Sequence, residues 1–166
     1  MNGSTVISSA IHTAIGRCNG NVLLFAAASN LGSSTYELFP AEHAQVFSIR
    51  GTDAKGTHAQ FNPSLPPRGG KVFGTLGVEV PARGIGHTGT SVATAIMSAI
   101  AAIILGYISV HREQEWREIR RYRGFENLLY ELSTEPDGQK HYITLDRHSS
   151  TQDEHRLKYK LSKASD

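Results

Sequence analysis

The first apolar residues of the chain recur every three or four positions, which predicts an amphipathic helix. This stripe consists of Ile7, Ile11, Ala14, Ile15 and Cys18. Ser4 and Thr5 precede it and belong to the residue types that cap helix N-termini, while Gly20 follows where a helix would end. The next segment, residues 22–28, is apolar at every position, which is typical of a strand covered on both faces of a sheet. We therefore expect a helix followed by a central parallel strand.

Two further apolar runs, at residues 46–49 and 72–76, predict additional strands separated by turn-rich stretches. Residues 91–108 carry no charge, a pattern that fits either a membrane span or a helix buried on all sides in an α/β protein. We favour the buried helix because the stretch is rich in alanine and lacks a basic N-terminal flank. Strands that alternate with helices predict an α/β fold with a mainly parallel, helix-covered sheet.

After this helix the chain becomes charged, and residues 112–132 predict surface helices with a break at Gly124. Four arginines form a basic cluster there: Arg117, Arg120, Arg121 and Arg123. An acidic partner would suit this cluster, although we favour a solvated helix face. Polar residues follow the turn signal at Pro136 and Asp137. The expected domain organisation is thus an α/β unit over residues 1–110, a charged helical extension over 111–135 and a polar tail over 136–166.

Composition narrows the possible partners and compartments. The 166 residues include 39% hydrophobic ones, enough for one domain with its own core. A net charge of +2 is too small to indicate nucleic acid or an anionic membrane as the main partner. Cys18 is the only cysteine, which excludes an intrachain disulfide and a multi-cysteine metal site. With no signal peptide visible at the start, we expect a cytoplasmic protein; no cofactor or metal is indicated.

Ser91 is the candidate nucleophile. A serine attacks well only when a base takes its proton and donors stabilise the oxyanion that forms. Ser91 follows Gly89 and Thr90 at the first turn of the long apolar helix, where free N–H groups and the helix dipole face developing negative charge. A simple helix cap fits the same residues. The second element is the strand that ends at Asn30, because ligands meet parallel sheets at the carboxyl ends of strands.

These segments resemble subtilisin-like serine peptidases. Residues 27–30 read Ala-Ala-Ser-Asn, similar to the family's Ala-Ala-Gly-Asn, and residues 89–95 read Gly-Thr-Ser-Val-Ala-Thr-Ala, similar to Gly-Thr-Ser-Met-Ala-(Ser/Thr)-Pro. Three further matches lie between them in the family's order. Residues 39–41 resemble Tyr-Pro-Ala, residues 51–56 resemble Gly-Ala-Thr-Asp with its glycine turn, and Phe61-Asn62 resembles Phe-Ser-Asn.

The resemblance implies that residues 1–110 are the C-terminal half of a subtilisin-like peptidase domain. It implies that Ser91 attacks a peptide carbonyl and that the Asn30 side chain forms the oxyanion hole with the Ser91 backbone N–H. Ser29 stands where the family has a glycine, beside the bound substrate. Ala95 replaces the family's proline, and Leu76 stands in the loop where the family has another proline.

In this family the triad aspartate and histidine precede the oxyanion asparagine, so the resemblance places them upstream of this chain. His87 is the one histidine near Ser91 in the sequence, but it lies four residues before it on the same turn. A base must approach the nucleophile from the far side of the substrate, so we interpret His87 as a solvated loop residue.

Three functions follow from these observations. The first is a serine endopeptidase fragment that acts on peptide or protein substrates and needs its N-terminal half, supplied by a partner or compensated by self-association. The second is a catalytically inactive interaction module with the same fold. The third, nucleotide binding by residues 29–34, is weak because that loop has one glycine and no lysine.

Overall fold

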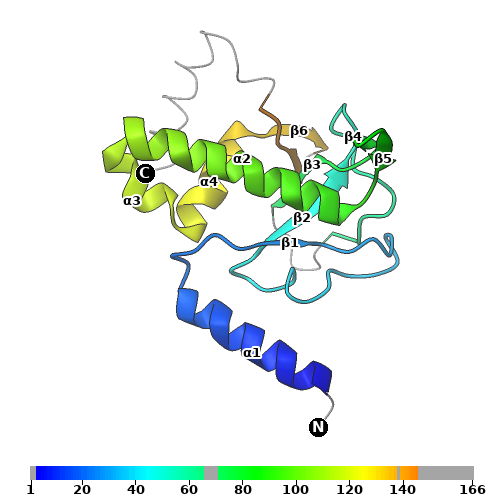
Figure 1. The fold of residues 1–166 in the computed structure, drawn as a ribbon, viewed down its shortest axis with the longest axis horizontal. Coiled ribbons are helices and arrows are strands. Elements are labelled where there is room, and N and C mark those ends of the chain that lie inside the picture. Colours follow the sequence, from blue (N-terminus) through cyan, green and yellow to red (C-terminus); the bar gives the residue numbers. More distant parts are fainter. Residues whose placement is uncertain (1–2, 66–70, 138, 146–166) are drawn as a thin grey trace.

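A five-stranded sheet organises the computed structural model, which describes residues 3–65, 71–137 and 139–145 (Figure 1). Its strands lie in the order β1 (Phe25–Ala27), β2 (Phe47–Thr52), β3 (Val72–Leu76), β7 (Lys140–Tyr142) and β6 (Thr134–Asp137). The first four are parallel, and β6 is antiparallel to β7. A separate hairpin consists of β4 (Val80–Ala82) and β5 (Ile85–His87). The expected α/β fold with a mainly parallel sheet is confirmed.

One face of the sheet carries the hydrophobic core. Helix α2 (Thr90–His111) packs along it through residues spaced three or four apart, and Phe47, Ile49 and Phe73 meet it from the strands. Helices α3 (Glu113–Ile119) and α4 (Tyr122–Leu132) complete this core with Ile119, Phe125, Leu128 and Leu129. Helix α1 (Gly3–Cys18) lies apart from them, beyond β1 (Figure 1). Ile15 is the buried residue among its described side chains.

Strand β1 lies at the sheet edge rather than at its centre, so the prediction of a central strand at residues 22–28 is wrong for the described chain. It pairs with β2 on one side and with no described strand on the other. Val22 is 50% exposed, and residues 23–27 are only half-buried. An apolar run indicates that a strand is buried, but it does not show how many neighbours the strand has. Among the described residues, β1 has a neighbouring strand on one side only.

Helix α2 is buried on one face, which corrects the expectation of a helix covered on all sides. Its outer face includes Ile103 at 59% and Val110 at 76% exposure. By length and composition α2 could span a membrane, with a mean hydropathy of 2.1. In the structure its inner face packs on β1, β2 and β3. The sequence of this helix does not show which face is buried, because small and apolar residues such as Ala99, Ala102 and Ile103 also lie on its outer face.

The charged segment forms the predicted helices, but Gly124 is not the break between them. The break falls at Arg120 and Arg121, and Gly124 lies inside α4. A Cβ at Gly124 would overlap the Glu118 carbonyl group, so the absence of a side chain lets α4 approach α3 closely. The apolar residues of both helices join the main core, so these are not merely surface helices.

The predicted polar tail begins as part of the sheet. His141, Tyr142 and Ile143 are buried, and the Ile143 N–H donates to the Gly74 carbonyl oxygen at 2.9 Å. The Thr75 hydroxyl donates to the Ile143 carbonyl oxygen at 2.7 Å. The turn signal at Pro136 and Asp137 is thus the end of β6 in a β6–β7 hairpin. Residues 146–166 lie outside the described residues.

Candidate active site

Two backbone hydrogen bonds connect the sheet to the start of α2. The Gly77 N–H donates to the Thr52 carbonyl oxygen at 2.9 Å, and the Gly89 N–H donates to the Gly77 carbonyl oxygen at 2.8 Å. Gly77 permits this because a Cβ there would lie 2.8 Å from the Gly51 Cα and 3.0 Å from the Ala93 Cβ. The carboxyl ends of β2 and β3 therefore fix where α2 begins.

Asn30 and Ser91 meet around Gly89, although they come from opposite ends of this part of the chain. A Cβ built on Gly89 would lie 3.1 Å from Asn30 Nδ2 and 3.5 Å from Ser91 Oγ. The two groups are therefore no further apart than about twice that distance, near enough to act on one carbonyl group. Gly89 has φ 149°, a conformation that L side chains rarely adopt, and its missing side chain keeps this space open.

The Asn30 carboxamide is held in one orientation. Its Oδ1 accepts the Thr90 N–H at 2.8 Å, which leaves Nδ2 as the group free to donate. Ser91 is exposed, and its N–H lies in the first turn of α2, where the helix provides no acceptor. The role of Thr90 was not foreseen from the sequence. The signal was present, since the first N–H groups of a helix need acceptors from elsewhere in the fold.

Ser29 precedes Asn30 with a buried side chain. It is 7% exposed, and its hydroxyl accepts the Leu31 N–H at 3.2 Å. Its φ of 148° lies in the region that favours glycine, the residue that the resemblance leads one to expect there. The side chain thus turns into its own loop and offers little surface to a substrate. A role of Ser29 in substrate binding remains a prediction.

His87 lies in the exposed β4–β5 hairpin, opposite Val80. Several other described histidines pack against rings away from Ser91: His12 against Phe39, His111 against Tyr107, and His141 against Phe73 and Tyr130. His58 lies beside Gly74. None of these contacts places an imidazole as a base for Ser91 among the described residues.

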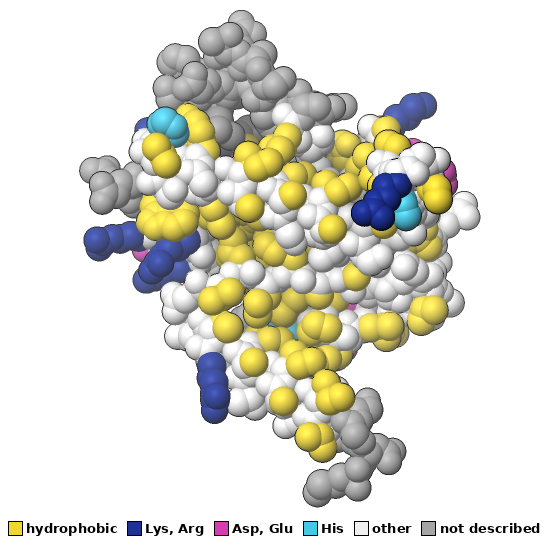
Figure 2. All heavy atoms as spheres, viewed as in Figure 1, with side chains coloured by type: hydrophobic (Ala, Val, Ile, Leu, Met, Phe, Trp, Pro, Cys, Tyr) yellow, Lys and Arg dark blue, Asp and Glu magenta, His cyan; other side chains and the backbone are white. Residues whose placement is uncertain are grey.

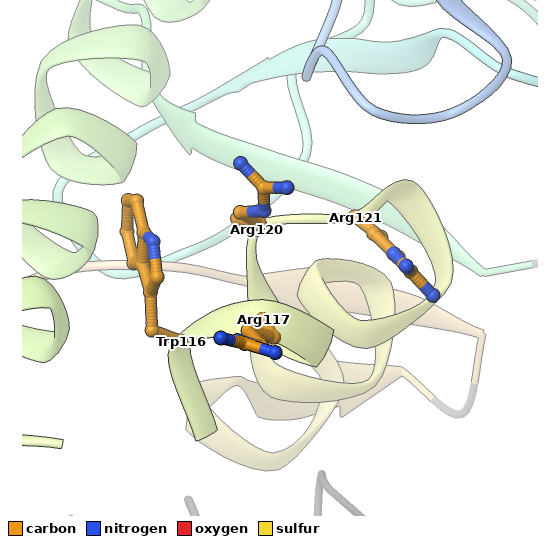
Figure 3. Close-up of a pocket in the computed structure, with 4 residues that line it drawn as sticks. All are labelled: Trp116, Arg117, Arg120 and Arg121. Atoms are coloured by element: carbon orange, nitrogen blue, oxygen red, sulfur yellow. The ribbon is translucent and has the colours of Figure 1, made fainter. Parts of the chain in front are cut away.

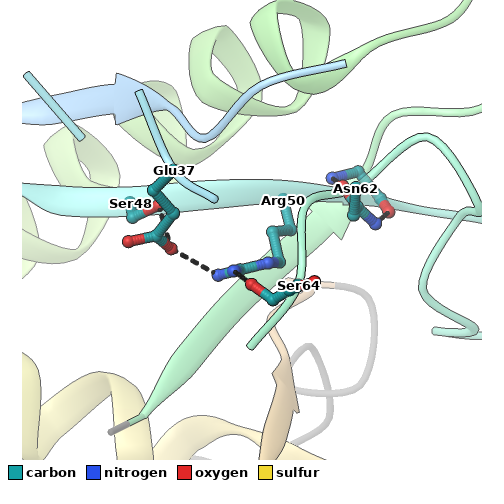
Figure 4. A network of polar contacts seen from close by, with 6 residues as sticks. Glu37, Ser48, Arg50, Asn62 and Ser64 are labelled. Carbon is teal, nitrogen blue, oxygen red and sulfur yellow. Dashed lines mark hydrogen bonds and ion pairs between the residues drawn. The ribbon is translucent and has the colours of Figure 1, made fainter. Parts of the chain in front are cut away.

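A polar network fastens the loop that follows Asn30 to β2 (Figure 4). Arg50 is 2% exposed, and its Nη1 lies 2.8 Å from Glu37 Oε1, which also accepts the Ser48 hydroxyl at 2.7 Å. Arg50 Nη2 donates to the Ser64 carbonyl oxygen at 2.9 Å. Burial lowers the pKa of Arg50, and the charge of Glu37 opposes that shift. The pair ties two loops to one strand.

Asn62 attaches a second point of the same loop region to β2, at Gly51 (Figure 4). Its Oδ1 accepts the Gly51 N–H at 2.9 Å, and its Nδ2 donates to the Gly51 carbonyl oxygen at 2.7 Å. Where β1 has ended, the side chain thus satisfies both backbone groups of a buried strand residue. This keeps β2 in register up to Thr52, which in turn holds Gly77.

We compared the chain with known proteins. The sequence matches no protein-family model and no curated protein. Among solved structures, the prenylagaramide maturation protease PagA superposes with a TM-score of 0.61 at 27% identity, over 74% of this chain and 45% of PagA. A mutant of the PatA protease domain gives a TM-score of 0.67 at 23% identity, over 89% of this chain and 52% of that domain.

The chain has a subtilisin-like fold. The subtilisin-like neighbours also include a PatG macrocyclase in complex with peptide, with a TM-score of 0.56 at 20% identity, over 75% of this chain and 39% of that one. The chain spans about half the length of the solved structures that it matches, or less. The recognition of a subtilisin-like fold from residues 27–30 and 89–95 is therefore confirmed.

Proposed function

We propose that this chain supplies the nucleophile and the oxyanion hole of a subtilisin-like serine endopeptidase, and that a complementary segment supplies the triad aspartate and histidine. The observation that carries the proposal is the hydrogen bond from the Thr90 N–H to Asn30 Oδ1 at 2.8 Å. It joins a strand end to a helix start across 60 residues and aims the remaining amide protons of Asn30 at the space beside Ser91. The protease neighbours support a peptide as the substrate class.

In this proposal Ser91 Oγ forms a bond to the carbonyl carbon of a peptide bond while a base takes its proton. The carbonyl oxygen becomes an oxyanion and accepts hydrogen bonds from Asn30 Nδ2 and the Ser91 N–H. The positive end of α2 favours the same negative charge. Collapse of this intermediate breaks the C–N bond, and the protonated base gives its proton to the leaving amine.

The base is proposed to come from outside this chain. His87 stands four residues before Ser91 on an exposed hairpin, paired with Val80. Without its base a serine of this kind retains only the modest help of the oxyanion hole. The alternative is a catalytically inactive interaction module. It is favoured by the departure from the family pattern beside Asn30, where Ser29 replaces a glycine at φ 148°.

A reconstitution experiment tests the proposal. The chain alone should show no turnover of a fluorogenic peptide, and joining it to a complementary segment that carries the triad aspartate and histidine should restore hydrolysis. Ser91→Ala should abolish that activity, and Asn30→Ala should reduce kcat by about 10²- to 10³-fold, a magnitude taken from a subtilisin rather than from this chain. Ser109→Ala, an exposed serine at the far end of α2, is the matched control.

Two outcomes contradict the proposal. Hydrolysis by the chain alone that disappears in Ser91→Ala would show that the base is within this chain. Failure of the joined, folded protein to hydrolyse any peptide in a mixed library would favour the inactive module.

A further inference from the structure

A hollow of about 490 Å³ lies at the end of α2 that is remote from Ser91, lined by Trp116, Arg117, Arg120 and Arg121 (Figure 3). Trp116 and Arg117 belong to the second half of α3, whereas Arg120 and Arg121 form the break between α3 and α4. The 22 residues of α2 extend about 33 Å, so this hollow is well separated from the candidate active site.

Three of the four residues that line the hollow are arginines. Arg121 lies 3.6 Å from Glu118, and both side chains are more than half exposed, so water weakens this pair. Glu115 is 3.6 Å from Arg112 instead. Among the side chains that the structure describes, neither Arg117 nor Arg120 has a carboxylate partner, although both are exposed.

An apolar groove of about 540 Å³ adjoins this hollow and shares Trp116 and Arg120 with it. Its other walls come from the approach to β1 and from α2, and they include Leu23, Phe25, Ala102 and Leu105. Figure 2 shows apolar side chains along this side of the molecule and basic side chains, Lys or Arg, at its end. A row of apolar surface that ends in guanidinium groups matches a polypeptide with apolar residues followed by carboxylates.

We propose that this surface docks an acidic segment of a partner polypeptide, whose carboxylates pair with Arg117 and Arg120 while its apolar side chains enter the groove beside Trp116. Guanidinium groups bind carboxylates in a two-pronged geometry, and buried tryptophan and arginine commonly dominate binding energy. The apolar groove suits side chains rather than a sugar–phosphate backbone. The net charge of +2 likewise provides no broad basic surface for nucleic acid.

Trp116 is the only tryptophan of the chain, so its fluorescence reports this hollow without any label. Eight-residue peptides are selected from a random display library on the full chain, with Ser91→Ala introduced to exclude cleavage. The selected peptides should be rich in Asp and Glu next to apolar residues, and they should change Trp116 emission. Their affinity should fall as salt rises, since exposed charge pairs are screened.

The double variant Arg117→Glu/Arg120→Glu should weaken binding of the selected peptides at least about tenfold, because like charges then face each other. Arg17→Glu/Arg83→Glu makes the same change of net charge at two exposed arginines elsewhere and should bind normally. Both variants should keep the melting temperature of the parent chain, since all four side chains are exposed.

Three results would overturn the proposal. The first is a selection without acidic enrichment, or peptides whose binding leaves Trp116 emission unchanged. The second is tighter binding of a single-stranded DNA oligonucleotide than of the selected peptides, which would identify a polyanion site. The third is an oligomer that dissociates in Arg117→Glu/Arg120→Glu without peptide, which would identify a second copy of this chain as the occupant.

Discussion

Ser29 occupies a backbone conformation that glycine adopts far more readily than other residues, with φ 148°. Alanine normally stabilises a chain relative to glycine, by roughly 0.5–1 kcal/mol. At this position the order should reverse, because alanine keeps the strain and both variants lose the bond to Leu31. We expect Ser29→Gly to unfold at higher denaturant than Ser29→Ala, by about 1–2 kcal/mol in the free energy of unfolding. Equal stabilities would show that the position is relaxed.

Gly89 keeps open the space between Asn30 and Ser91. Gly89→Ala should abolish hydrolysis by the joined protein, although both candidate catalytic groups remain, because the new Cβ would lie 3.1 Å from Asn30 Nδ2. Gly84→Ala is a matched control, since Gly84 also has positive φ, at 77°, but no heavy atom lies within 4 Å of its Cβ position. Both variants should lose roughly 1–3 kcal/mol of stability. Normal kcat/KM in Gly89→Ala would disprove the assignment of this space to the oxyanion.

Two glycines inside helices should respond to the same substitution with opposite sign. Gly106 in α2 is exposed with open space around it, so Gly106→Ala should stabilise the protein by roughly 0.5–1 kcal/mol. In α4, Gly124→Ala places a methyl group against the Glu118 carbonyl and should destabilise by about 1–3 kcal/mol. Thermal melting of the two variants tests this, and a stabilised Gly124→Ala would mean that α3 and α4 are free to separate.

The edge position of β1 makes the described part of the molecule incomplete on one side. We expect the chain alone to self-associate, because an apolar strand edge offers a template for pairing. Val22 lies three residues before β1 and is 50% exposed, so Val22→Lys should shift the size-exclusion profile towards monomer, since a charge beside an apolar strand edge disfavours pairing there. Val110→Lys makes the same change on the outer face of α2 and should leave the profile unchanged. A monodisperse parent chain that melts cooperatively would instead indicate a self-sufficient module.

The local pattern of the sequence predicts most helices and strands, but it does not predict which strands pair with one another. The run at residues 72–76 coincides with β3, and the apolar stripe from Ile7 to Cys18 coincides with α1. Periodicity reports burial and not sheet order, so the edge position of β1 was missed. Strands β6 and β7 were missed because His141 and Tyr142 are buried by β3, a partner far away in the chain. The approach of Asn30 to Ser91 was foreseen only through the family resemblance.

The Glu37–Arg50 pair has a consequence for the descent of this chain. Loss of one partner leaves the other charge buried and unpaired, which lowers the free energy of unfolding by about 3–5 kcal/mol. Replacement of both residues by apolar residues of similar size changes this free energy little. A single substitution at either position is therefore strongly destabilising, so we expect the two positions to change together in evolution. Aligned relatives should carry either both charges or neither. A folded relative with a lone arginine at position 50 would need a carboxylate from another loop, and its structure would show which loop had taken over the anchoring of β2.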